Sequence, residues 1–239
     1  SANFTVNGRF YTGGYNATIG SLSGTGHVAS GINTVGRADT LTVGEKNQNT
    51  TFSGVIHGNR SSTLDGQEES GTLALTKTGT GTLTLTGANT YTGATSVNAG
   101  VLVIGNGTSG SIRSNSTVSV ASNATLALNQ ANNTTFNNTV TNNGIVLFNQ
   151  SGNLTLGGVI SGTGKVNQNG TGTTTLTGAN TYLGATSVNA GVLQLKDGAI
   201  SSKSGLFTVD ANGTLRLTEA SVAFTSARNF GSVLAGAGQ

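Results

Sequence analysis

Residues 81–102 read GTLTLTGANTYTGATSVNAGVL, and residues 172–193 repeat the phrase as GTTTLTGANTYLGATSVNAGVL. The two copies agree at 20 of 22 positions and lie 91 residues apart. A long repeat at a fixed offset is typical of a solenoid, in which each coil buries its apolar side against its neighbours. If one coil takes about 22–23 residues, the offset corresponds to four coils and the whole chain to about 10 coils.

Apolar residues alternate with Thr, Ser or Asn in short segments throughout the chain. Such pairs occur at Leu73/Leu75, Leu83/Leu85, Leu102/Ile104, Leu126/Leu128, Leu154/Leu156 and Leu193/Leu195. A period of two buries one side of a strand and leaves the other exposed, and no segment has the spacing of a core-facing helix. The sequence therefore predicts an all-β protein folded as one domain over 1–239, with repeat copies near 19–128 and 154–217.

The composition favours a parallel β-helix over its main rival, a β-sandwich or jelly roll. The chain has no Pro, which suits a parallel β-helix because nearly every strand N–H donates to the next coil. A sandwich needs hairpins and an antiparallel order, which do not account for two near-identical phrases 91 residues apart.

The composition also excludes several functions. The chain has no Cys, so disulfides, thiolate metal sites and Cys nucleophiles are ruled out. Its net charge is +3, and its basic residues are scattered singly from Arg9 to Arg228, which disfavours a nucleic-acid surface. Leu, Val, Ile and Phe make up about 23% of the chain, above the roughly 20% that marks disorder.

The repeated phrases resemble a known family. Residues 75–107, LTKTGTGTLTLTGANTYTGATSVNAGVLVIGNG, and 169–198, NGTGTTTLTGANTYLGATSVNAGVLQLKDG, are similar to the passenger-associated transport repeat of bacterial autotransporters, also called the autotransporter-associated β-strand repeat. The resemblance implies a right-handed parallel β-helix (β-solenoid). It also implies export by a Gram-negative bacterium through an outer-membrane β-barrel, normally C-terminal in the same polypeptide and absent from these residues.

Two departures from a regular repeat stand out. Thr174 occupies the position at which Leu83 faces inward in the first copy. The segment NRSSTLDGQEES at 59–70 is inserted between two coils and holds Arg60, Asp65, Glu68 and Glu69. We expect this segment to be a solvated loop that projects from the rod and is cleaved first by proteases. The alternative is a partner-contact loop formed by these four charged residues. A glycosidase-like carboxylate pair is disfavoured.

The sequence offers little chemistry. Only His27 and His57 could act as a base near neutral pH, and no G-x-S-x-G elbow is present. GNGTSG at 105–110 matches G-x-G-x-x-G, but no helix pattern follows it, and we interpret it as a turn. Acidic residues are too few for a calcium site. We therefore expect no catalytic residue, no cofactor and no metal.

The turn residues of the repeat are expected to be structural. Asn89 and Asn180 suit a tight turn with hydrogen bonds to a neighbouring coil, and Tyr91 and Tyr182 are expected to pack over it. The Thr ranks at Thr82/Thr84/Thr86 and Thr173/Thr175/Thr177 are similar to those of ice-binding solenoids. Because they are expected four coils apart rather than on successive coils, ice binding is disfavoured.

The leading functional hypothesis is a non-enzymatic stalk or adhesin passenger of an autotransporter, secreted or displayed on the surface of a Gram-negative bacterium. Its expected partners are host or bacterial surface molecules, or other copies of itself. We expect no nucleic-acid partner, and contact with a membrane only through the absent translocator barrel. The chain has the properties of a passenger because a Cys-free chain cannot form disulfides in the oxidising periplasm.

The alternative is a subunit of a head-to-tail extracellular filament, such as a biofilm fibre. The phrase FGSVLAGAG at 230–238 resembles a restart of IGSLSGTG at 19–26. A β-helix has open ends that invite further strands, and a heterologous contact that does not close produces a fibre.

Overall fold

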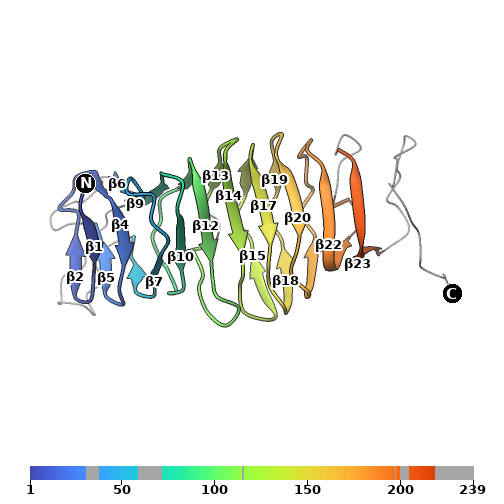
Figure 1. The fold of residues 1–239 in the computed structure, drawn as a ribbon, viewed down its shortest axis with the longest axis horizontal. Coiled ribbons are helices and arrows are strands. Elements are labelled where there is room, and N and C mark those ends of the chain that lie inside the picture. Colours follow the sequence, from blue (N-terminus) through green and yellow to red (C-terminus); the bar gives the residue numbers. More distant parts are fainter. Residues whose placement is uncertain (31–37, 59–71, 115, 197, 200–204, 219–239) are drawn as a thin grey trace.

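The computed structural model describes residues 1–30, 38–58, 72–114, 116–196, 198–199 and 205–218. Within these ranges every regular element is a β-strand and every strand pair is parallel. The strands stack along the length of a rod, with the chain advancing steadily from one end to the other (Figure 1). The expected all-β, right-handed parallel β-helix is confirmed, with about nine turns.

Each full turn contributes three segments, so the rod has three faces. The first face contains β1 (Asn3–Thr5), β4 (Ser21–Ser23), β7 (Thr50–Phe52), β10 (Thr82–Leu85), β12 (Gly100–Ile104), β14 (Ala124–Leu128), β17 (Ile145–Phe148) and β20 (Lys165–Gln168). The second contains β2 (Arg9–Tyr11), β5 (His27–Ala29), β8 (Val55–Ile56), β15 (Thr134–Phe136), β18 (Asn153–Leu156) and β21 (Thr173–Leu176). The third contains β3 (Ala17–Ile19), β6 (Ala38–Val43), β9 (Thr72–Lys77), β11 (Thr95–Val97), β13 (Val118–Val120), β16 (Val140–Asn142) and β19 (Ile160–Ser161).

Two long strands join the first and second faces near the C-terminal end of the described chain. The first residues of β22 (Thr186–Leu195) pair with β20, and its last residues pair with β21. The strand β23 (Phe207–Leu217) follows the same path one turn later, with a register shift between Val188 and Ala190.

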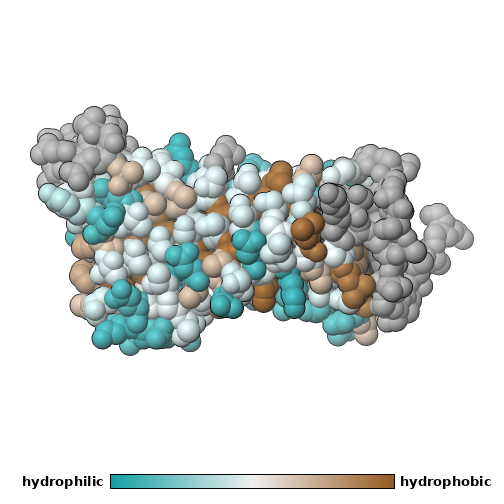
Figure 2. Space-filling model, turned by 90° about the horizontal axis from the view of Figure 1, so that it is seen from above, coloured by the Kyte–Doolittle hydropathy of each residue, from teal (hydrophilic) through white to brown (hydrophobic). Residues whose placement is uncertain are grey.

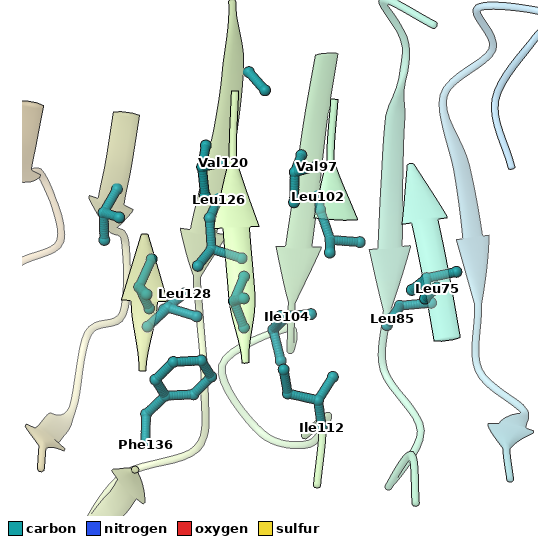
Figure 3. Close-up of a cluster of buried hydrophobic side chains, with 14 of the residues drawn as sticks. Leu75, Leu85, Val97, Leu102, Ile104, Ile112, Val120, Leu126, Leu128 and Phe136 are labelled. Atoms are coloured by element: carbon teal, nitrogen blue, oxygen red, sulfur yellow. The ribbon is translucent and has the colours of Figure 1, made fainter. Parts of the chain in front are cut away.

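The core is a continuous file of inward-facing side chains (Figure 3). Leu85, Ile104 and Leu128 are register partners on β10, β12 and β14, and all three are fully buried. The alternating pattern makes this possible, because every second side chain of a strand faces inward. Burying a Leu or Ile side chain contributes about 1.5–3 kcal/mol.

The two copies of the repeat lie on different faces. Successive register partners of Leu83 are Leu102, Leu126, Val146 and Val166. Four turns therefore end at Val166, on the first face, and Thr174 lies eight residues further on, on the second face. The expectation of four coils of 22–23 residues is wrong, because most turns in this region take about 20 residues. The copies are related by four turns and one face.

Gly100 and Gly191 mark the same corner in the two copies. Their φ angles are 65° and 62°, in the left-handed region that side chains rarely adopt. A Cβ atom at either position would also lie within about 2.5 Å of a backbone carbonyl oxygen of the preceding turn, Gly79 O or Gly170 O. Glycine is required there, so the corner has the same shape on both faces.

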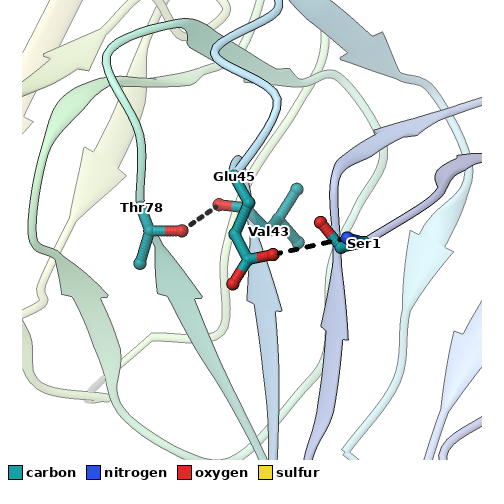
Figure 4. A network of polar contacts seen from close by, with 4 residues as sticks. All are labelled: Ser1, Val43, Glu45 and Thr78. Carbon is teal, nitrogen blue, oxygen red and sulfur yellow. Dashed lines mark hydrogen bonds and ion pairs between the residues drawn. The ribbon is translucent and has the colours of Figure 1, made fainter.

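Side-chain contacts also link neighbouring turns near the N-terminal end. Thr78 Oγ1 donates a hydrogen bond to Val43 O over 3.3 Å, and the amino group of Ser1 lies 3.8 Å from Glu45 Oε2 (Figure 4). Because the Glu45 side chain is half exposed, this ion pair contributes little stability. The backbone ladder and the buried core stabilise this end of the rod more than this ion pair does.

Candidate functional site

The segment predicted to project from the rod is not among the residues that the structure describes. Arg60, Asp65, Glu68 and Glu69 all lie in 59–71, outside the described residues. Its projection, its sensitivity to proteases and its role as a partner-contact loop stay predictions.

The repeated asparagine forms a bridge between three turns. Asn89 Oδ1 accepts a hydrogen bond from Ile56 N, and Asn89 Nδ2 donates to Gly87 O and Ser111 O, each over 2.9 Å. Asn180 makes the equivalent bonds with Ile160 N, Gly178 O and Ala199 O. Both side chains are buried, so the predicted structural role of these asparagines is confirmed.

The tyrosine of the same turn is also structural. Tyr91 is fully buried, and its hydroxyl lies 2.6 Å from Thr95 Oγ1. Tyr182 and Thr186 form the same pair over 2.7 Å. Burial raises the pKa of Tyr91, and the hydrogen bond with Thr95 opposes that shift. Because both phenols are buried, neither copy offers them to a ligand.

Thr174 is explained by a polar network inside the rod. Its Oγ1 accepts a hydrogen bond from Gln150 Nε2 and donates one to Gln168 Oε1, each over 2.6 Å. Gln168 Nε2 in turn donates to Gly170 O over 2.7 Å. In the first copy, Leu83 stands at the position of Thr174, and Lys77 stands at the position of Gln168. The hydrogen-bonded pair of Thr174 and Gln168 is therefore specific to the second copy.

Lys77 is a buried cation that has carbonyl partners. Its Nζ donates to Thr78 O over 2.6 Å, to Gly79 O over 2.9 Å and to Ala99 O over 3.2 Å. Three acceptors match the three N–H groups of an ammonium. Burial lowers the pKa of Lys77 to about 8. No opening leads to it, because the side chain is almost completely enclosed.

Asp39 is a buried carboxylate near the N-terminal end. Its Oδ2 accepts hydrogen bonds from Thr12 Oγ1 and Ser30 Oγ, both over 2.7 Å, whereas Oδ1 has no hydrogen-bond partner. Asp39 ties the turns of β2, β5 and β6 together, which is a structural role.

The glycine-rich hexapeptide is a turn, as the sequence predicted. Asn106 Oδ1 accepts hydrogen bonds from the backbone N–H groups of Thr108 and Ser109. Gly105, Gly107 and Gly110 all have positive φ. The backbone donors that a phosphate would need are therefore partly used within the turn.

The outer surface differs from face to face. The predicted Thr ranks are separated: Thr82 and Thr84 lie on the first face, and Thr173 and Thr175 on the second. A hydroxyl rank that sequence reasoning missed runs through seven successive turns of the third face, at Thr18, Thr42, Thr76, Ser96, Ser119, Thr141 and Ser161. The pairing register of the strands reveals this hydroxyl rank. The sequence does not, because the spacing between its members varies from 20 to 34 residues.

The first face carries the outward apolar residues. Val101 and Val103 on β12 and Ile145 and Leu147 on β17 are partly exposed in outward positions, and Ala127 on β14 is buried between Val103 and Leu147. The side of the rod seen in Figure 2 is mostly pale, with separate brown and teal areas. Charged side chains therefore do not dominate this side.

The two histidines meet on the second face. His27 Nδ1 lies 2.9 Å from His57 Nε2, and both side chains are partly buried. Burial and, to a smaller extent, the charge of His27 lower the pKa of His57. The sequence identified both residues but gave no sign of their contact, because 30 residues separate them, more than the length expected for one coil.

Neither a metal cage nor a membrane-spanning helix occurs in the residues that the structure describes. Across those ranges, three or more His, Asp or Glu side chains nowhere gather as a metal cage would require. Within the same part of the chain, no helix has the length and apolar character needed to cross a membrane.

The comparison with family models gave one match. The model of the passenger-associated transport repeat matches residues 75–104 and 166–195, about a quarter of the chain and the same two segments that carry the Asn–Tyr turn. Searches of curated proteins and of solved structures gave no match.

Proposed function

Because this β-helix carries two passenger-associated transport repeats, we propose that it is part of an autotransporter passenger, exported and displayed on the surface of a Gram-negative bacterium. The two matched repeats carry this proposal. We further propose that it acts as a non-enzymatic stalk or adhesin. The polar groups inside the rod support that role, since Lys77, Asp39 and Thr174 bond within the fold rather than facing a cleft.

The architecture suits a chain that folds after crossing a membrane as an extended polypeptide. Within the described ranges each turn pairs only with its immediate neighbours, so a turn can form as soon as the one before it is in place. The bridging asparagine supports this stepwise growth, because Asn89 bonds to the turn before and the turn after its own.

A surface-display assay tests the passenger proposal. The chain is fused in front of an autotransporter translocator in a Gram-negative host, and its exposure is measured with antibodies on intact cells. We expect the wild-type chain to be labelled on intact cells and to resist added protease. A chain that remains inside the cell, although the translocator reaches the outer membrane, contradicts the proposal.

The finer proposal is that the exposed faces mediate attachment or self-association. The outward apolar residues of the first face and the hydroxyl rank of the third face support it, since such surfaces are largely uncharged. Displaying cells should settle or bind host cells faster than cells that carry the translocator alone.

Leu147→Glu is the informative variant for that assay, with Asn167→Glu as its matched control. The two residues are register partners on the outward side of β17 and β20. We expect Leu147→Glu to reduce settling or attachment at least threefold and Asn167→Glu to have less effect. Equal effects of both variants contradict a role for the apolar side chains.

The head-to-tail filament remains the second hypothesis. β23 is the last strand within the described ranges and pairs with β22, while 230–238 lies outside them. Straight fibres seen by negative-stain microscopy at rising concentration support the filament. A monomer at millimolar concentration rules it out.

A further inference from the structure

His27 and His57 are the only two histidines among 239 residues, and they contact each other. His27 lies on β5 and has Val55 of β8 as its register partner, and His57 follows two residues after Val55, directly beyond β8. Thirty residues of sequence separate the rings, yet His27 Nδ1 and His57 Nε2 are 2.9 Å apart. Two neighbouring turns of the rod therefore bring the two imidazole rings of this sequence into contact.

The contact requires that the two rings share a proton. Their centroids are 5.1 Å apart and the ring planes make an angle of 30°, so the rings are closer to parallel than to perpendicular where the two nitrogens meet. The other nitrogen of His57, Nδ1, lies 3.5 Å from Thr90 Oγ1. When His57 Nδ1 donates its proton to Thr90, His57 Nε2 presents a lone pair toward His27.

We propose that the His27–His57 pair is a binding site for a divalent transition-metal ion of the copper or nickel type. Neutral imidazole nitrogens suit Cu²⁺, Ni²⁺ and Zn²⁺. Binding requires His27 to move its ring proton from Nδ1 to Nε2, so that two lone pairs face the metal in place of the shared proton. No oxidation or reduction is involved, and the charge of the pair itself stays neutral.

The separation of the nitrogens favours particular ions. Two nitrogens 2.9 Å apart, each bound at about 2.0–2.1 Å, subtend an angle of about 90° at the metal. That angle belongs to adjacent positions of a square-planar or tetragonal centre, as in Cu²⁺ or Ni²⁺, rather than to a tetrahedral Zn²⁺ site. Both rings must turn about their Cβ–Cγ bonds so that the lone pairs converge, and water completes the coordination.

The surroundings set the strength of the site. Thr90 acts as the second partner that fixes the tautomer of a ligating histidine. Arg9 is the register partner of His27, and its positive charge disfavours a bound cation. We therefore expect modest affinity, and tighter binding in Arg9→Gln.

The test is a titration of the purified chain with CuCl₂, NiCl₂, ZnCl₂ and MgCl₂ at pH 7.5, followed by calorimetry and by the unfolding midpoint. We expect one Cu²⁺ per chain, weaker Ni²⁺ and Zn²⁺ binding, and no effect of Mg²⁺. Electron paramagnetic resonance of the copper complex should show coupling to two nitrogens. Affinity should fall below about pH 6, because protons compete for the same lone pairs.

His27→Gln and His57→Gln are the decisive variants, and circular dichroism checks that each remains folded. Each variant should lower the Cu²⁺ affinity at least tenfold, and the double variant should lose the stoichiometric site. The proposal is overturned if the double variant binds Cu²⁺ as the wild type does. It is also overturned if millimolar Cu²⁺ leaves the wild-type midpoint unchanged while the pair still responds to pH, which makes it a proton site only.

Discussion

At the scale of single residues, the interior of the rod is more polar than the alternating pattern suggests. Thr174, Gln150 and Gln168 satisfy one another, and Lys77 is enclosed by three carbonyl oxygens. The sequence marked Thr174 as a departure from the repeat but could not name its partners. Gln150 approaches it from the previous turn, and that approach depends on the register.

Thr174→Val should destabilise the rod although it adds an apolar group to the core. The substitution leaves Gln150 Nε2 and Gln168 Oε1 without the hydroxyl they share, which costs about 1–3 kcal/mol of unfolding free energy. Urea denaturation measures the change, with the outward-facing Thr175→Val as control, expected within about 0.5 kcal/mol. Equal stability of the two variants would show that the network contributes nothing.

Lys77 gives the rod an unusual pH dependence. Burial lowers its pKa to about 8 from 10.5, so between these values the unfolded chain binds the proton and the folded chain does not. The free energy of unfolding therefore rises with pH across that window. Above about pH 10 the raised pKa of Tyr91 acts in the opposite direction.

Lys77→Gln isolates this effect, because the second copy has Gln168 at the equivalent position. We expect the stability difference between the wild type and Lys77→Gln to change in favour of the wild type from pH 8 to pH 10. Denaturation at several pH values measures it. A difference that is constant with pH contradicts the account.

At the scale of elements, the sequence predicted the strands well and the turns between them poorly. The alternation around Leu83/Leu85 and Leu102/Ile104 appears as β10 and β12. The offset of 91 residues gives only the summed length of the turns between the two copies. The length of each single turn could therefore not be predicted. The loops between strands vary in length, so the repeat's change of face and the contact of His27 with His57 both escaped sequence reasoning.

The turn that contains Asn89 and Tyr91 in the first copy, and Asn180 and Tyr182 in the second, makes the same hydrogen bonds on two different faces of the rod. Asn89→Ala and Asn180→Ala each remove bonds to three turns, and each should cost about 1–3 kcal/mol. Because the sites are far apart, their effects should add. Exposed Asn98→Ala serves as the control in thermal or urea denaturation. A large cost at one site and none at the other contradicts an equivalent role.

Leu85→Asp and Thr84→Asp compare the inner and outer sides of one strand. Leu85 is fully buried, whereas Thr84 faces outward. Leu85→Asp buries an unpaired charge and should abolish cooperative folding of the neighbouring turns, as hydrogen exchange would show. Thr84→Asp should leave them folded. The reverse order would mean that β10 is turned over.

At the scale of the whole molecule, the described part of the rod is a stack of short parallel strands, each paired with strands of the neighbouring turns. The length of the rod and its continuous core follow from the repeat. The displacement of the second copy by one face relative to the first does not. Four turns and one face separate the two copies, so equivalent outward residues point to different sides. Repeated surface chemistry is thereby distributed around the rod rather than concentrated on one side.

Spin-label distances test this arrangement most directly, and the absence of Cys allows labels at chosen positions. Thr84 and Asn167 are linked by four register steps on the first face, about 19 Å at the usual strand spacing. Thr175, equivalent to Thr84 in the repeat, lies on the second face. Pulsed electron paramagnetic resonance should give a shorter distance for the 84/167 pair than for 84/175. A shorter distance for 84/175 would place both copies on one face and contradict the account.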